Sequence, residues 1–234
     1  IGAAGDAQKA YDAGVTIGTY LKQLGFNVDY APVADVLTNP GNTAIGTRSF
    51  GSDASMVADM VIKELEGLSS QGVFGAVKHF PGQGGVSGDS HDGAVTLDKS
   101  LEELMQTELV PFQKALENGV SFVMVGHISV PQVVGDNTPA SLSQMMVSNV
   151  LREQLGYQGI VITDAMNMGA ITGTYTADQA AVMAVNAGVD MILMPQDYET
   201  AYNGLLQAVQ DGTISEERID ESVERIVKVK LQMQ

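Results

Sequence analysis

Cysteine is absent from the 234-residue sequence, and basic residues are scarce. Without cysteine the chain has no disulfide, no thiolate metal ligand and no cysteine nucleophile. Its 12 lysines and arginines stand against 28 aspartates and glutamates, a formal net charge of −16. So acidic a surface repels phosphate groups, which excludes nucleic acid and anionic membranes as expected partners. No apolar run approaches the roughly 20 residues that a membrane-spanning helix needs.

The composition is otherwise that of a globular protein, with 44% hydrophobic residues. A chain of this length has room for one sizeable core, so residues 1–234 are interpreted as a single domain. The chain starts at Ile1, with neither an initiator methionine nor the basic start of a signal peptide. We therefore expect the beginning of the polypeptide to be missing or processed away.

Strand and helix patterns alternate along the chain. Valine- and isoleucine-rich segments, typical of strands buried on both faces, cover residues 27–35, 73–79, 120–127, 159–164 and 189–194. Apolar residues at helical spacing predict helices over 101–116, with a kink at Pro111, over 142–155 and over 215–230. This alternation predicts an α/β fold with a parallel sheet, either an open doubly wound sheet or a (β/α)₈ barrel.

Polar residues at the predicted strand ends favour the barrel. Asp35, Lys78 and His79, His127 and Asp164 each stand at the C-terminal end of a different strand. Barrel enzymes collect their chemistry at that end of many strands, whereas an open sheet concentrates it beside one switch point. The sequence therefore predicts a (β/α)₈ TIM-barrel type of fold.

A glycine-rich loop between residues 78 and 92 contains Asp89 and His91, two positions apart. In extended backbone such residues point to the same side, so the carboxylate can bind one imidazole nitrogen and leave the other for proton transfer. The alternative interpretation is a solvated turn, in which Asp89 is a turn former and His91 has no chemical role.

The other polar residues also allow two interpretations each. Asp164 is either a reactive carboxylate or the N-cap of the segment after it. Lys78, with His79 beside it, is either a hydrogen-bond donor to a polar ligand or a Schiff-base lysine. His127 is either a ligand contact or a core histidine, and Arg48 either binds substrate or forms a structural ion pair. No metal-ligand spacing is present among the histidines, so neither a metal nor another cofactor is expected.

Taken together, these residues form the constellation of a retaining hydrolase. One carboxylate attacks, a histidine–carboxylate pair protonates the leaving oxygen, and basic side chains hold a polyhydroxylated substrate.

The motifs resemble glycoside hydrolase family 3, and within it the β-N-acetylglucosaminidase branch. The matching segments are Ala31–Asp35 (A-P-V-A-D), Ile45–Gly51 (I-G-T-R-S-F-G), Lys78–Gly82 (K-H-F-P-G), Asp89–His91 (D-S-H), Met124–His127 (M-V-G-H), Ile162–Met166 (I-T-D-A-M) and Arg218–Ile226. K-H-F-P-G followed by D-S-H is specific, because most other branches of the family lack that histidine.

The resemblance implies a retaining exo-β-N-acetylglucosaminidase that releases terminal N-acetylglucosamine from chito-oligosaccharides or from muropeptides in peptidoglycan recycling. Asp164 would be the nucleophile, and His91, oriented by Asp89, would be the acid/base. A neutral histidine beside an anionic nucleophile avoids like-charge repulsion. The substrate-binding residues implied are Arg48, Lys78, His79, Asp35, His127 and Met166. The peptide bond between Phe80 and Pro81 is predicted to be cis.

Other functions stay open at this point. The same family could provide a β-glucosidase or a β-N-acetylglucosaminide phosphorylase, in which phosphate resolves the glycosyl-enzyme. From other classes, the chain could be a non-catalytic sugar-binding barrel fragment, or an aldolase that uses Lys78.

Two departures from the family pattern stand out. Gln83-Gly84-Gly85 follows K-H-F-P-G, where the branch has His-Gly-Asp. The family's first strands and its acidic D-Q-E-G-G segment should also precede Ile1. We therefore expect a barrel that is incomplete at its N-terminus, with an upstream segment or another chain covering the gap. The acidic, cysteine-free composition gives a weak preference for a secreted or cell-envelope location over the cytoplasm.

Overall fold

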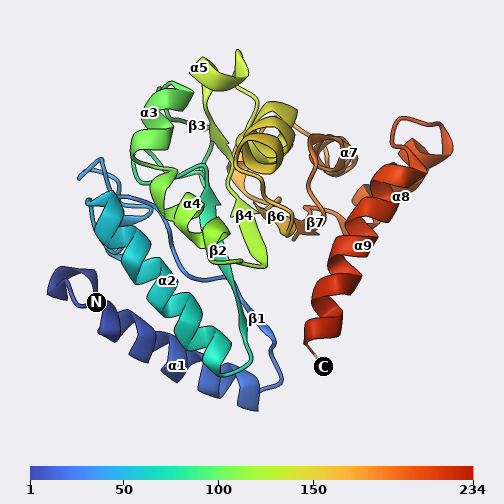
Figure 1. The fold of residues 1–234 in the computed structure, drawn as a ribbon. Helices are drawn as coiled ribbons and strands as arrows, with labels where there is room; N and C mark the ends of the chain where they lie inside the picture. The colour runs from blue at the N-terminus through green and yellow to red at the C-terminus, as the bar shows by residue number, and fades with distance from the viewer. Residues whose placement is uncertain (234) are drawn as a thin grey trace. The chain divides into compact units, whose positions relative to one another are not determined.

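The computed structural model describes residues 1–233, which form two compact units (Figure 1). The first comprises residues 1–87 and 101–124, and the second comprises residues 88–100 and 125–232. Both units consist of parallel strands with helices, so the predicted α/β class with a parallel sheet is confirmed. No helix among residues 1–233 is long and apolar enough to cross a membrane.

The first unit has three strands in the order β1-β2-β4, with β1 and β2 parallel. Its elements are η1 (Gly2–Ala4), α1 (Ala7–Gln23), β1 (Val28–Asp29), η2 (Gly46–Arg48), α2 (Ala54–Ser70), β2 (Phe74–Phe80), α3 (Leu101–Gln106), α4 (Val110–Glu117) and β4 (Phe122–Val125). Helices α1 and α2 lie side by side (Figure 1), and each begins at an aspartate N-cap, Asp6 and Asp53. A Cβ on Gly67 would come within 2.3 Å of the Tyr11 carbonyl oxygen, so this close packing requires glycine.

Two elements of the first unit differ from the sequence prediction. The strand expected over 27–35 is regular only at 28–29, with one further bridge from Val33 to Lys78. Between them stands Pro32, which has no N–H to give to a ladder. The single kinked helix expected over 101–116 is two helices, because the chain turns at 107–109, and Pro111 lies in the first turn of the second one. The peptide bond between Phe80 and Pro81 is cis, as predicted.

The second unit is built around the parallel pair β6 and β7. Its elements are β3 (Val95–Thr96), β5 (Ile128–Ser129), α5 (Pro131–Val134), η3 (Ala140–Leu142), η4 (Met145–Gln154), β6 (Ile160–Ala165), α6 (Gly169–Thr172), α7 (Ala177–Ala187), β7 (Met191–Leu193), α8 (Tyr198–Gln210) and α9 (Glu216–Gln232). The helix predicted over 142–155 is present from 145 but has π geometry. The short strands β3 and β5, which pair in parallel, were not predicted.

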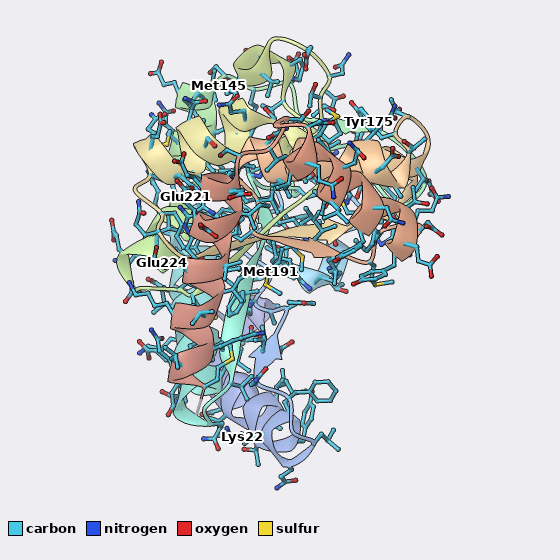
Figure 2. The ribbon with its side chains drawn as sticks, turned by 90° about the vertical axis from the view of Figure 1, so that its right-hand side faces the viewer. Lys22, Met145, Tyr175, Met191, Glu221 and Glu224 are labelled. Atoms are coloured by element: carbon cyan, nitrogen blue, oxygen red, sulfur yellow. The ribbon has the colours of Figure 1, made fainter. Side chains whose placement is uncertain are left out.

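One buried carboxylate joins the elements of the second unit where β7 begins. The Asp190 side chain is closed off from solvent and accepts hydrogen bonds from Arg152 at 2.6 Å, Ser222 at 2.6 Å and Arg225 at 3.1 Å. Arg152 lies on η4, and Ser222 and Arg225 lie on α9. Figure 2 labels Met191, which follows Asp190 in the chain, and Glu221, which precedes Ser222 on α9. The ion cluster therefore fixes η4 and α9 to the strand.

Candidate functional site

In the first unit, His79 near the end of β2 and Asp35, two residues beyond the Val33 bridge, form a buried pair. The Asp35 side chain has no exposed surface, and His79 is 4% exposed. His79 Nδ1 lies 2.8 Å from Asp35 Oδ2, while the backbone N–H of Gln83 donates to Asp35 Oδ1 at 2.6 Å. A carboxylate only accepts, so Nδ1 carries the imidazole proton. Asp35 thus fixes the orientation and tautomer of His79.

Arg48 extends this chain of contacts. It closes the short turn η2, and its Nη2 lies 3.5 Å from His79 Nε2. Since a guanidinium only donates, Nε2 is the accepting nitrogen, in agreement with a proton on Nδ1. The order Asp35, His79, Arg48 therefore runs from a buried carboxylate to an exposed cation.

The segment that departs from the family pattern is held by its backbone. Asn42 Nδ2 donates to the Gln83 carbonyl at 2.6 Å, and the Asn39 N–H donates to the Gly84 carbonyl at 3.1 Å. A Cβ on Gly84 would lie 1.9 Å from the Val36 carbonyl oxygen. Gln83 and Gly84 therefore position the loop after K-H-F-P-G through main-chain contacts and close packing.

Two acidic residues, Glu64 and Asp29, interact electrostatically with Lys78. Glu64 on α2 is buried, and its burial, together with the charge of Asp29, raises its pKa to about 7, while Lys78 acts in the opposite sense. Burial likewise raises the pKa of Asp29, against the effect of Lys78. No sequence pattern connects Glu64 with this strand, because the residue stands in an apolar helical stripe.

In the second unit, Asp89 and His91 form the predicted pair. His91 Nδ1 lies 2.7 Å from Asp89 Oδ1, which also accepts the His91 backbone N–H at 2.9 Å. Nδ1 is therefore the donor, and Nε2 is the nitrogen available for proton transfer. The His91 side chain is 63% exposed and that of Asp89 36%. The pairing arises in a turn, with the Asp92 N–H bonded to the Asp89 carbonyl, and not in extended backbone as expected.

Asp164 and His127 lie at the ends of neighbouring segments in the same unit. Asp164 is half-buried at the end of β6, and its Oδ1 accepts the N–H of Ala165 at 2.8 Å. His127 is 1% exposed; its Nε2 lies 3.0 Å from the Ala165 carbonyl oxygen and its Nδ1 lies 2.7 Å from Ser141 Oγ. A carbonyl only accepts, so Nε2 carries a proton. These contacts fit the core-histidine interpretation, and they hold the backbone of Ala165, the residue that follows Asp164.

The structure thus divides the predicted site residues between the units. Arg48, Lys78, His79 and Asp35 belong to the first, and Asp89, His91, His127, Asp164 and Met166 to the second. Met166 is 2% exposed, and its N–H donates to the Leu193 carbonyl at 2.9 Å, so its backbone joins β6 to β7.

Sequence reasoning missed the buried residue Glu108. Its side chain accepts a hydrogen bond from Thr38 Oγ1 at 3.2 Å, and a Cβ on Gly82 would collide with it. No sequence signal marked Glu108.

Comparison with known proteins shows that this chain is similar to the members of one family. The profile described as "Glycosyl hydrolase family 3 N terminal domain" matches residues 1–229. Beta-hexosaminidase LpqI of Mycobacterium tuberculosis is 36% identical over 231 residues, which cover 95% of this chain and 59% of the relative. A protein of Arthroderma benhamiae, named as an uncharacterized secreted glycosyl hydrolase, is 34% identical over 227 residues, 94% of this chain and 64% of the relative.

The solved structures agree. A glycoside hydrolase family 3 beta-N-acetylglucosaminidase from Paenibacillus sp. str. FPU-7 superimposes with a TM-score of 0.97 at 43% identity, over 99% of this chain and 45% of that one. This likeness confirms the barrel type of fold predicted from the strand ends. The chain spans about 40 to 64% of the length of the curated relatives it matches.

Proposed function

Because this chain belongs to glycosyl hydrolase family 3, we propose that it carries the catalytic machinery of a retaining exo-β-N-acetylglucosaminidase. The relatives named beta-hexosaminidase support a glycoside hydrolase with a carbohydrate substrate. The observation that carries the finer proposal is the hydrogen bond between Asp89 and His91, because it directs Nε2 of an exposed imidazole to proton transfer.

In the proposed first step, an Asp164 carboxylate oxygen attacks the anomeric carbon of the terminal sugar. The glycosidic bond breaks as protonated His91 gives its Nε2 proton to the leaving oxygen, and a covalent glycosyl-enzyme forms. Asp89 keeps its hydrogen bond to Nδ1 and so stabilises the imidazolium before the transfer. In the second step, neutral His91 takes a proton from water, whose oxygen attacks the same carbon and releases Asp164.

Arg48, Lys78 and His79 are proposed to bind the sugar hydroxyls, with Arg48 and Lys78 as the hydrogen-bond donors. In this proposal Asp35 acts through His79, since its oxygens already accept the His79 Nδ1 hydrogen and the Gln83 N–H. His127 in the second unit acts in the same indirect way, by holding the Ala165 carbonyl. Met166 stays a predicted substrate contact.

The test separates nucleophile from acid/base. Asp164→Ala is expected to abolish turnover of every substrate, because no covalent intermediate can form. His91→Ala should retain cleavage of 2,4-dinitrophenyl N-acetyl-β-glucosaminide, whose leaving group needs no proton, and lose cleavage of N,N′-diacetylchitobiose. Asp92→Asn, an exposed neighbour in the same loop, is the matched control and should behave like the parent. Full activity of the Asp164 variant would refute the mechanism.

A 2-fluoro glycosyl trap followed by peptide mass spectrometry reports the nucleophile directly. The label is expected on the peptide that contains Asp164. The same assays distinguish the other candidates. Formation of a sugar 1-phosphate in phosphate buffer would identify a phosphorylase, and preference for the glucoside would identify a β-glucosidase. Binding of N-acetylglucosamine in a calorimeter without any turnover would identify a sugar-binding barrel.

A secreted or cell-envelope location is also proposed, with the relative named as a secreted glycosyl hydrolase in support. Fractionation of source cells with an antibody to this chain tests it, and recovery in the cytoplasm alone would contradict it.

A further inference from the structure

The loop that carries Asp89 and His91 is bound by the segment that follows Asp164. The Gly169 N–H donates to the His91 carbonyl at 3.0 Å, and the Ala170 N–H donates to the Ser90 carbonyl at 3.1 Å. Both donors belong to the first turn of α6, and both acceptors are main-chain groups. The contact therefore fixes the backbone of the loop and leaves the His91 imidazole to its side-chain partner.

The fit at this contact requires glycine. A Cβ on Gly169 would lie 2.7 Å from the His91 carbonyl oxygen and 2.9 Å from the carbonyl carbon and oxygen of Asp92. All of these atoms are backbone, so they cannot move aside as a flexible side chain could. Any larger residue at position 169 must push the loop away or break the hydrogen bonds.

The two loop residues at this contact differ in burial. Ser90 is 1% exposed, whereas its neighbour His91 has a side chain that is 63% exposed. The chain after the loop is anchored by β3, which pairs with β5, and by the Leu97 N–H, which donates to the Ser129 carbonyl at 2.9 Å. The loop is thus seated on the unit through Ser90 and its backbone, with the imidazole outward.

We propose that the Gly169 and Ala170 amides form a latch that positions the acid/base loop relative to the nucleophile. The proposal rests on the proposed function of His91 and Asp164. Only four residues separate Asp164 from Gly169, so one short segment carries the nucleophile and seats the loop that delivers the proton. Gly169 and Ala170 are positioning residues, since they act through the His91 and Ser90 carbonyls.

Gly169→Ala tests the latch through the leaving group. Cleavage of N,N′-diacetylchitobiose should fall at least tenfold, a part of the about 10²- to 10⁴-fold that general acid catalysis contributes. Cleavage of the 2,4-dinitrophenyl glycoside should change little. In a His91→Ala background the same substitution should have no further effect on either substrate. Gly93→Ala is the control, because a Cβ there meets nothing within 4 Å.

Hydrogen–deuterium exchange gives a readout that is independent of activity. In the parent, the Gly169 and Ala170 amides should be protected, and Gly169→Ala should accelerate their exchange. Ala170→Pro removes one donor without a Cβ at 169, and proline is tolerated in a first helical turn, so it serves as the second variant.

The outcomes separate the two proposals. Unprotected amides in the parent, equal losses on both glycosides, or an additive loss in the His91→Ala background would overturn the latch. If exchange responds to the latch variants while His91→Ala cleaves chitobiose normally, the two amides do hold the loop backbone, and it is the proposed role of His91 that fails.

Discussion

Glu64→Gln is expected to stabilise the folded chain above neutral pH. Glu64 is buried on α2, and its pKa in the folded chain is about 7, against 4.5 for the free side chain. Below about pH 4 the carboxyl is protonated in both states and contributes nothing. Between these two values the unfolded chain ionises while the folded chain keeps its proton, so the free energy of unfolding falls as the pH rises.

The size of the effect follows from the same two values. Each factor of ten in the acid constant corresponds to about 1.4 kcal/mol, so ionised Glu64 lowers the free energy of unfolding by about 3 kcal/mol above pH 8. Glutamine has nearly the same shape and carries no charge. The difference in stability between Glu64→Gln and the parent should therefore grow by about 3 kcal/mol from pH 4 to pH 8.

Urea unfolding followed by far-ultraviolet circular dichroism measures this difference, since the chain has no tryptophan to follow by fluorescence. Glu66→Gln is the matched control, because the Glu66 side chain is 46% exposed and lies two positions further along the same helix. Its difference from the parent should stay within about 0.5 kcal/mol at every pH. Parallel stability curves for the parent and Glu64→Gln would refute the reasoning.

Three further substitutions have expected outcomes. Asp190→Asn leaves several arginines without their buried carboxylate and should lower the free energy of unfolding by about 3 kcal/mol in urea. Asp35→Asn weakens the hydrogen bonds that orient His79 and should raise KM for the aryl glycoside about 10- to 100-fold, the effect of losing a hydrogen bond to a charged group. Gly84→Ala places a Cβ against the Val36 carbonyl and should lower the midpoint of thermal unfolding, at a cost of about 2 kcal/mol.

Matched controls make these outcomes decisive. Asp211→Asn and Asp59→Asn remove exposed carboxylates, and Gly93→Ala adds a Cβ in open space. The cluster would be of little importance if Asp190→Asn and Asp211→Asn unfolded at the same urea concentration. An unchanged KM for Asp35→Asn would contradict its role behind His79, and equal melting of the two alanine variants would contradict the packing argument.

The strands that position the site can be predicted because each is a continuous apolar run that follows a glycine. Such a run is specific when the strand is buried on both faces, and residues 73–79 and 159–164 lie within one residue of β2 and β6. The prediction for the first strand is too long because apolar character persists through Ala31–Pro32, where the ladder is interrupted. Two-residue strands such as β3 have too few residues to show any periodicity.

The pairing of Asp89 with His91 is predictable because a separation of two residues lets both side chains reach one another in several backbone conformations. The expected conformation is extended, whereas the structure has a turn in which Asp89 also accepts the His91 N–H. The pair of Asp35 and His79 is different. They stand 44 residues apart, and only the rule that parallel strands end at one edge brings them together. That rule gives proximity, but it does not tell which group contacts substrate and which lies beneath it.

Main-chain contacts account for what the sequence could not indicate. A search for chemistry in a sequence looks for side chains, and at Gly169 the relevant feature is the lack of one. The two amides that seat the loop are present in almost any pair of residues, so their identity carries no signal. What makes position 169 different is the 2.7 Å between the place that a Cβ would occupy and the His91 carbonyl oxygen, a property of two segments 78 residues apart. A side chain at this point would displace His91, the proposed proton donor, while every residue of the D-S-H motif and Asp164 stayed intact. Sequence motifs alone therefore cannot establish that such a chain is active, whereas the identity of residue 169 bears directly on it.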